Sequence, residues 1–337
     1  MRFKSILNTT VKVILPLVLG CLLLWFLYRK MDFVEIWDVV RSGVRYDIIL
    51  LSLLFGLGAN IIRGWRWGLL IDTLGQRYKM GNLIYAVLGN YAINFVLPRV
   101  GEVWRCGIIT KYEKISFPKL LGTLLIDRVT DTLTVGLMTL FILVFHFGFF
   151  RSFFAGNPEL MITFPDDNSM LWILLGCAVV ALGVWFTFTR LGHLSPVRKA
   201  RGLLSNVWEG MKSLWLMERK WLFLLQTLLI WGCYYLFFYV TFYAFGFTSG
   251  LGASVGLIVF VMSSIGVAVP IQGGIGPWHF MVIASLVCFG VKETDAAAFA
   301  LVVHTTQSAW TALCGLVGIV ALPVTNKDAE RHETTDL

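Results

Sequence analysis

A segment between two long apolar runs, NFVLPRVGEVWR (residues 94–105), carries a proline, a glycine and three charges. Pro98 and Gly101 are expected to stop a hydrophobic helix near the depth of a membrane core. Freed backbone groups and charges find no water in lipid. We therefore expect this segment to face other protein or a wet cavity, and we look for function there. Its charged side chains are Arg99, Glu102 and Arg105.

Composition predicts an all-α polytopic membrane protein, because 57% of residues are hydrophobic, 14% are charged and the mean hydropathy is +0.76. The first apolar run ends at residues 28–31 (YRKM) without a small-residue cleavage site, so it should remain a helix. About six full spans are expected. The runs long enough to cross a bilayer lie near 13–29, 48–71, 118–148, 171–189, 221–246 and 295–322.

The cysteines and the net charge exclude several classes of protein. The six cysteines are scattered without a CxxC pair, so neither a disulfide nor a metal site is predicted, and no cofactor is expected. The net charge of +8 is interpreted as membrane orientation and contact with anionic lipid, with no nucleic-acid partner.

Basic residues predict the topology, since cytoplasmic loops are rich in Lys and Arg. Basic clusters precede the first run, surround the break and fill the stretch between 190 and 220. If all three are cytoplasmic, residues 81–116 must be a re-entrant hairpin, entering over 81–97 and leaving over 102–116, because another full span would invert everything after it. The loop at 30–46, which is also basic, is the weak point of this scheme. Both termini are expected in the cytoplasm of a bacterial inner-membrane protein.

A second interruption predicts a second re-entrant hairpin over about 254–290, with a Pro/Gly-rich turn at 270–277. Two broken segments in corresponding halves indicate an inverted-repeat-like arrangement with a site at the bilayer midplane. Gly252 and Gly256 fit the simpler explanation, tight helix packing. The glycines of the turn at 270–277 do not fit this explanation, because a run rich in proline and glycine ends a helix. An interfacial amphipathic helix is expected over about 195–217, and a polar tail follows the single transmembrane domain, residues 1–322, over 323–337.

Several polar groups lie inside apolar runs. Arg63 and Arg66 are late in the second run, where snorkelling to the surface is the simple alternative for Arg66. A DRVTD motif (127–131) lies about 15 Å of rise into the third run. Its acids share a helix face and need a nearby cation; a structural ion-pair network is the alternative to a functional one. A lone membrane histidine such as His279 or His304 is more often a packing residue than a ligand.

Four motifs together resemble the lysylphosphatidylglycerol synthase transmembrane family over about residues 10–322. They are RGWRW (63–67), the LPRVGE break (97–102) with Asn94 and Arg105, DRVTD (127–131), and Pro270 with the following GGIG turn (273–276). The resemblance implies a flippase-like, lipid-handling module with broken helices. It is expected to be a stand-alone member without the aminoacyl-transferase domain, and His279 stands where many members carry Glu.

The favoured function is a non-enzymatic transporter or flippase for an anionic lipid, either a phospholipid or a polyprenyl-phosphate-linked lipid. Arginines would bind phosphate, and the acids would orient them or carry a coupling proton. Alternatives are a lipid-modifying membrane enzyme with Glu102 or Asp127 as base, or a scaffold for lipid synthesis. A homo-oligomer or a lipid-synthesis partner is left open. The candidate lipid-binding residues are Arg63, Arg66, Asn94, Arg99, Glu102, Arg105, Asp127, Arg128, Asp131, Gly273, Gly274, Gly276 and His279.

Two structural expectations follow. Asp127 and Asp131 should lie within reach of arginines from other segments. The turns at 98–102 and 270–277 should enter from opposite faces, approach each other near the midplane, and line one polar cavity that opens sideways to lipid. The charges of the first turn should point into that cavity, with His279 on its opposite wall.

Overall fold

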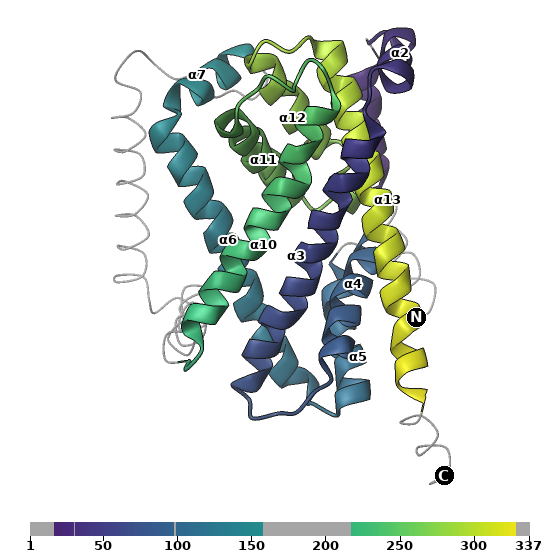
Figure 1. Cartoon of the computed structure of the whole chain (residues 1–337), viewed down its shortest axis with the longest axis vertical. Helices are drawn as coiled ribbons and strands as arrows, with labels where there is room; N and C mark the ends of the chain where they lie inside the picture. The colour runs from purple at the N-terminus through teal and green to yellow at the C-terminus, as the bar shows by residue number, and fades with distance from the viewer. Residues whose placement is uncertain (1–16, 30, 98, 158–216, 328–337) are drawn as a thin grey trace, which may run out of the picture. The chain divides into compact units, whose positions relative to one another are not determined.

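The computed structural model describes residues 17–29, 31–97, 99–157 and 217–327. All regular secondary-structure elements among these described residues are helices. One isolated antiparallel β-bridge also joins Val44 to Phe245. The predicted all-α class is confirmed. The chain divides into two compact units, residues 1–124 with 221–337 and residues 125–220 (Figure 1). The predicted single domain stays a prediction.

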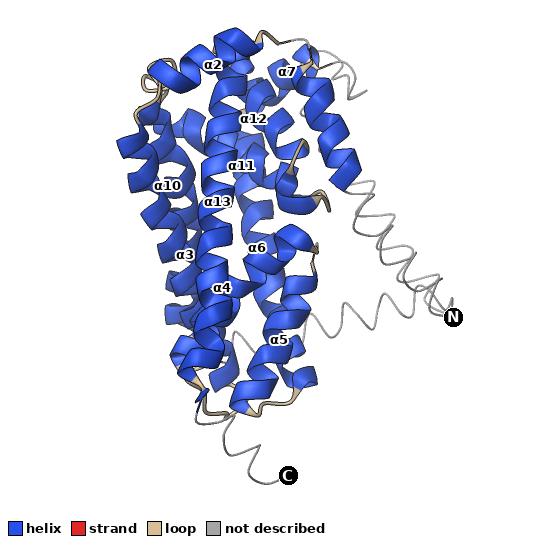
Figure 2. Cartoon of the chain, turned by 90° about the vertical axis from the view of Figure 1, so that its right-hand side faces the viewer, coloured by secondary structure: helices blue, strands red, loops and turns tan. Residues whose placement is uncertain are grey.

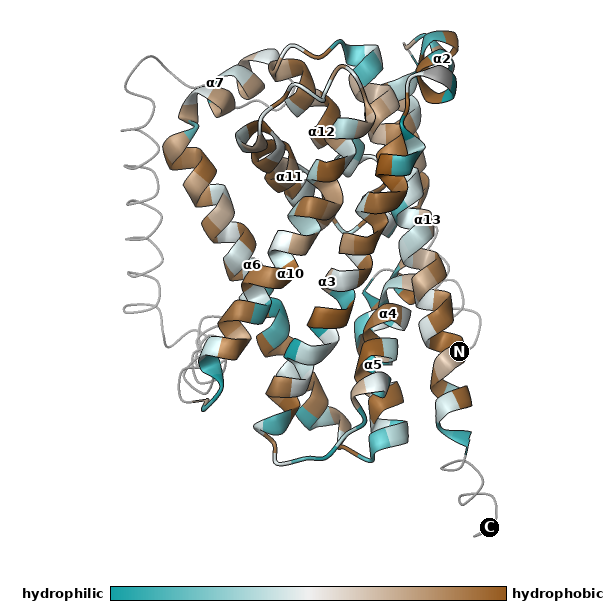
Figure 3. Ribbon diagram, in the orientation of Figure 1, coloured by the Kyte–Doolittle hydropathy of each residue, from teal (hydrophilic) through white to brown (hydrophobic). Residues whose placement is uncertain are grey.

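Four described helices are long and apolar enough to cross a membrane. Each corresponds to a run expected from the sequence, and the run at 171–189 and the amphipathic stretch at 195–217 lie outside the described residues. Figure 3 shows apolar residues predominating along α3 and α10. The four are α3 (Tyr46–Asp72), α6 (Phe117–Phe145), α10 (Lys220–Tyr239) with its 3-10 extension η2 (Val240–Ala244), and α13 (Glu293–Thr325).

Two helical hairpins made of shorter helices stand beside α3 and α13 in the first unit. Figure 2 shows the first in the lower half of this bundle and the second in the upper half, while α13 runs past both. The first hairpin is α4 (Met80–Val96) and α5 (Val100–Glu113); the second is α11 (Ala253–Ala268), the 3-10 turn η3 (Gln272–Gly274) and α12 (Pro277–Cys288).

Small residues hold α4 against α13. A Cβ added to Gly318 would lie 2.6 Å from the Tyr85 carbonyl oxygen, and one on Gly315 would lie 2.5 Å from the Ala92 Cβ. Such contacts let two backbones approach closely, as at helix interfaces in membranes. At the helix ends, the amides of Asn82 and Asn326 donate to each other at 3.0 and 2.8 Å. The first helix of this hairpin, α4, is therefore fixed to α13 from Asn82 to Ala92.

The stretch 30–46, expected as a loop, contains the helix α2 (Phe33–Ser42). Asp32 caps it by accepting from the Val34 backbone N–H at 2.8 Å, a local signal that the hydropathy pattern does not show. An ion pair between Glu35 and Lys292 ties α2 to the start of α13. At the other end, α13 continues through Pro323, past the expected start of the tail. The second unit adds α7 (Phe147–Gly156).

Candidate functional site

The first hairpin reverses direction between the end of α4 at Val96 and the start of α5 at Val100. Arg99 adopts the left-handed conformation with φ of 63°, and α5 begins at the next residue. The first backbone N–H groups of a helix have no partner inside the helix. One of them, that of Gly101, donates to the Asn94 side-chain oxygen at 2.9 Å. Asn94, predicted to bind lipid, therefore has a structural role that closes the turn.

Gly101 was expected to stop a helix, and this is wrong. It lies in the first turn of α5, and the break comes before it. A Cβ at Gly101 would lie 2.1 Å from the Asn90 carbonyl oxygen, closer than any real contact. The glycine is needed because α5 crosses α4 almost backbone to backbone at this point. Helix packing, and not helix breaking, explains the residue.

The three charges after the break differ in their surroundings. Arg99 is exposed and Glu102 is partly exposed, whereas Arg105 is fully buried. The Arg105 guanidinium carbon lies 4.5 Å from the centre of the Trp67 ring of α3, a cation–π contact. The Trp67 ring nitrogen in turn donates to the Thr123 hydroxyl at 2.9 Å. Arg105 is thus directed at α3, and the charges nearest the turn are Arg99 and Glu102.

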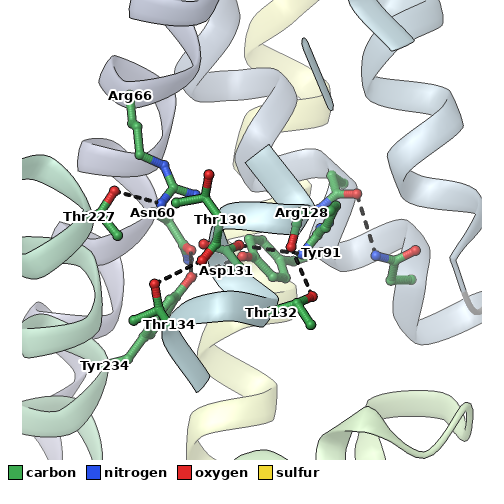
Figure 4. Close-up of polar contacts among 12 residues, drawn as sticks. Asn60, Arg66, Tyr91, Arg128, Thr130, Asp131, Thr132, Thr134, Thr227 and Tyr234 are labelled. Atoms are coloured by element: carbon green, nitrogen blue, oxygen red, sulfur yellow. Dashed lines mark hydrogen bonds and ion pairs between the residues drawn. The ribbon is translucent and has the colours of Figure 1, made fainter. Parts of the chain in front are cut away.

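Arg63 and Arg66 are buried in the first unit, with exposed fractions of 2% and 0%. Snorkelling to the surface is therefore excluded for Arg66. Its guanidinium donates to the Thr227 hydroxyl of α10 at 3.1 Å, as Figure 4 shows. The Arg63 guanidinium lies 5.6 Å from the centre of the Tyr234 ring. Both arginines of α3 therefore face α10.

A chain of hydrogen bonds that was not predicted from the sequence joins three helices (Figure 4), and the Arg63 guanidinium lies against the ring of its Tyr234. The Tyr234 hydroxyl donates to the Asn60 side-chain oxygen at 2.8 Å and lies 2.9 Å from the Tyr91 hydroxyl. Because Tyr234 has one hydroxyl hydrogen and uses it on Asn60, Tyr91 is the donor in the second contact. Tyr91 could not be singled out beforehand, because it is one tyrosine in an apolar run.

The turn of the second hairpin depends on glycine. Gly273, Gly274 and Gly276 all have positive φ, at 59°, 71° and 94°, where other residues are strained. Pro277 then begins α12, a position that favours proline because its missing N–H would have no helical partner. A Cβ on Gly276 would lie 2.8 Å from the Leu23 Cβ of the N-terminal helix Leu17–Tyr28. These glycines, predicted to bind substrate, shape the backbone.

The two turns approach each other, which confirms that part of the expectation. A Cβ on Gly273 would lie 2.7 Å from the ring of Phe95, near the end of α4. The two hairpins lie in opposite halves of the bundle (Figure 2), and this contact joins them. The Gly273 carbonyl oxygen also lies 2.8 Å from the His304 ring nitrogen Nε2 of α13. The lining of a cavity at this place stays a prediction.

His279 is 2% exposed and belongs to a cluster of rings. Its ring centre lies 4.5 Å from that of His304 and 6.2 Å from that of Tyr28. No group of three His, Cys, Asp or Glu suited to a metal ion occurs in the described part of the chain. His279 therefore lies on the side of the second turn, with another histidine as its neighbour.

The charges of the DRVTD motif lie in the second unit, on α6. Asp127 and Asp131 are buried, and the Arg128 guanidinium lies 3.9 Å from the Asp131 carboxylate three residues further along the helix (Figure 4). Thr132 donates to the Arg128 carbonyl oxygen at 2.9 Å, which satisfies its hydroxyl within the helix. Pairing of these acids with arginines from other segments stays a prediction.

The fold defines a class: an all-α, multi-pass membrane protein with interrupted helices. The family model described as the lysylphosphatidylglycerol synthase TM region matches residues 13–315. The chain belongs to this family, so the resemblance seen in the four motifs is confirmed.

A curated relative is the UPF0104 membrane protein MJ1595 of Methanocaldococcus jannaschii. It is 27% identical to this chain over 100 residues, which are 29% of this chain and 30% of the relative. The match therefore spans less than a third of either protein, and it supports membership of a membrane-protein family without identifying an activity.

Proposed function

We propose that this protein translocates an anionic lipid headgroup across the membrane without chemical conversion, through the region where its two hairpin turns meet. The contact of Phe95 with Gly273 is the observation that carries the proposal. Short helices that end inside a membrane leave peptide groups that need a polar environment. Two such ends placed together can make a polar path for a headgroup while the acyl chains stay in lipid.

The lengths of the short helices support re-entrant hairpins. At 1.5 Å of rise per residue, α5 with 14 residues is about 21 Å long and α12 with 12 residues about 18 Å. The hydrocarbon core is about 30 Å thick. Neither helix crosses it, so each hairpin enters and leaves on one face. Because the two hairpins lie at opposite ends of the bundle, they would enter from opposite faces of the membrane.

Buried arginines supply the charge that such a lipid requires. Arg63, Arg66 and Arg105 are at most 2% exposed in a bundle of apolar helices. Charges inside membrane segments are expensive and mark substrate pathways more often than not. A guanidinium matches the geometry of phosphate oxygens and stays charged when buried. The exposed Arg99 would attract the headgroup at the turn, and the buried arginines would stabilise it along the path.

The alternative, a lipid-modifying enzyme, needs a second activated substrate. A catalytic base alone does not supply one, and the described residues contain no metal-binding cluster to activate water or a donor. A scaffold role needs no buried arginines. We place the protein in the bacterial cytoplasmic membrane with both termini inside.

Reconstitution tests the function directly. Vesicles containing the protein and phosphatidylglycerol with a fluorescent headgroup label are treated with an impermeant reductant, and the inner-leaflet signal is followed. We expect more bleaching than in protein-free vesicles. Arg63→Gln or Arg66→Gln should reduce the rate of this protein-dependent bleaching at least about tenfold, since a lost charged contact is worth about 1.5–3 kcal/mol. The exposed Arg45→Gln is the matched control. Unlabelled polyprenyl phosphate and phosphatidylglycerol compete in separate arms to identify the lipid.

Mass spectrometry of the same vesicles separates the alternatives. A new covalent lipid product would make the protein an enzyme. Bleaching no faster than in protein-free vesicles, with the protein folded and inserted, would remove the transport proposal.

Topology has its own test in a cysteine-free background. Single cysteines at Lys79 and Lys111 should react from one face of the membrane, and those at Gly250 and Lys292 from the other face. Lys79 and Gly250 precede the two hairpins, Lys111 lies in the last turn of α5, and Lys292 follows α12. Labelling of Lys79→Cys and Lys111→Cys from opposite faces would show that α4 and α5 do not form a re-entrant hairpin.

A further inference from the structure

Two imidazoles meet where the second turn touches the long helix α13. His279 of α12 and His304 of α13 have ring centres 4.5 Å apart, although they are 25 residues apart in the chain. The Trp278 ring lies 5.0 Å from His304 and 5.4 Å from His279. His279 is buried and His304 partly buried. The pair is adjacent to the proposed lipid path, because His304 contacts Gly273 of the second turn.

The hydrogen bonds of the pair assign its protons. His304 Nε2 lies 2.8 Å from the Gly273 carbonyl oxygen, which only accepts, so Nε2 carries a hydrogen. The Gly276 backbone N–H donates to His279 Nδ1 at 3.5 Å, so Nδ1 carries a lone pair. Both neutral rings therefore carry their hydrogen on Nε2, and they differ in how they are bound: His304 donates from Nε2, whereas His279 accepts on Nδ1.

These states predict which histidine binds a proton. His304 can take a proton on Nδ1 and keep its bond to Gly273. His279 could take one on Nδ1 only by losing the bond from Gly276 at the start of α12. Two imidazolium ions at 4.5 Å would also repel each other strongly in a buried site. The pair can therefore bind at most one proton, and its hydrogen bonds favour His304 as the site.

We propose that His304 is the proton-binding site that couples proton movement to lipid translocation, with His279 as its neutral partner; this inference rests on the proposed function. The bond from His304 to Gly273 becomes charge-assisted when His304 is protonated, and such bonds are roughly twice as strong as neutral ones. Gly273 is the residue that touches Phe95 of the first hairpin. Proton binding thus tightens the contact between the hairpin turns, and proton release loosens it.

The groups around the pair fit this role. From the N-terminal helix, Tyr28 faces His279 at 6.2 Å between ring centres, and its hydroxyl donates to the Ala297 carbonyl oxygen at 3.0 Å. The turn contributes the peptide groups of Gly273 and Gly276, and α12 contributes Trp278. A third metal ligand does not join the pair within the described residues.

The first test imposes a pH gradient on the fluorescent-phosphatidylglycerol vesicles. The native protein should translocate lipid at least about 5-fold faster with the gradient than without it, the low end of ordinary coupling between sites. His304→Gln keeps a donor for Gly273 and cannot titrate, so it should retain translocation without a gradient and lose the stimulation. His146→Gln, which removes a histidine of the second unit, should behave as native protein.

Rival proton carriers are tested in parallel with Glu102→Gln and Asp127→Asn. Loss of the stimulation in either variant, with the stimulation retained in His304→Gln, would overturn the inference. A native protein that translocates lipid at the same rate with and without the gradient would also overturn it. Absence of translocation under every condition would instead contradict the proposed function.

A second measurement needs no transport. Histidine-labelled protein in detergent is titrated by NMR between about pH 5 and 8, the range in which histidine ordinarily changes charge. One imidazole of the pair should gain a proton, the signal should disappear in His304→Gln, and the His279 ring should remain neutral. Protonation of His279 with His304 unchanged, or of neither ring, would contradict the assignment.

Discussion

The turn between α4 and α5 and the turn between α11 and α12 bring their hairpins to the same place by different means. The first occupies residues 97–99, contains a left-handed arginine and is closed by the Asn94 side chain. The second is longer, includes a 3-10 turn and relies on three glycines with positive φ. The first turn therefore depends on side chains, and the second on backbone conformation.

This difference bears on how each turn can function. Side chains that close the first turn leave a charged residue exposed at its tip, where it can meet a lipid headgroup. The second turn has no charge of its own at 270–277 and offers peptide carbonyls, one of which binds His304. We therefore expect the first turn to be sensitive to side-chain substitution and the second to backbone restriction.

The largest effect is expected for Gly101→Ala. The new Cβ would lie 2.1 Å from the Asn90 carbonyl oxygen, so the two helices of the first hairpin must separate. The loss of stability should exceed about 3 kcal/mol, the upper end of ordinary overpacking. Thermal unfolding in detergent measures it. Gly107→Ala, on the same helix with open space around the added atom, should change little or stabilise the helix.

Gly276→Ala should cost less, about 1–3 kcal/mol, through backbone strain at φ of 94°. Contact of the new Cβ with Leu23 adds to it. Gly290→Ala separates the two causes, because Gly290 has φ of 84° and nothing within 4 Å. The same unfolding assay should rank Gly276→Ala above Gly290→Ala. Equal losses would show that strain alone matters and that the N-terminal helix does not restrict the second turn.

Much of the architecture of the two hairpins could be predicted from the sequence, because prolines, glycines and apolar runs act locally. The predicted arms 81–97 and 254–269 agree with α4 and α11 within a residue or so. The long runs among the described residues became helices, and the four motifs indicated the right family. Local patterns carry this information because helix length and helix ends depend on neighbouring residues.

The details of the site could not be predicted, since they depend on contacts between distant segments. The Tyr91–Tyr234 bond joins residues 143 positions apart, and His279 meets His304 across a turn between helices. The left-handed Arg99 has no signal in composition, because this conformation is rare outside glycine and asparagine. Gly101 appeared to be a helix breaker because its close approach to Asn90 exists only after folding.

A smaller loss is expected for Asn94→Ala. The substitution removes the acceptor for the Gly101 N–H and should cost about 1–2 kcal/mol, as for other lost helix caps. Asn94→Asp keeps an oxygen in place and puts a negative charge near the positive end of α5, so it should retain most of the stability. If both variants unfold at the native temperature, the Asn94 bond does not hold the first turn.

Arg99→Gly should have the smallest effect on stability and the opposite sign. The left-handed conformation costs a non-glycine residue about 1–2 kcal/mol, while glycine loses about 0.5–1 kcal/mol through its freedom in the unfolded chain. The variant should therefore gain about 0–1.5 kcal/mol in the unfolding assay and yet translocate labelled phosphatidylglycerol more slowly. Arg99→Lys keeps both the strain and the charge, so it should match the native protein in stability and remain closer to it in rate. A faster Arg99→Gly variant would show that the strained residue limits movement of the turn, and that its charge does not recruit lipid.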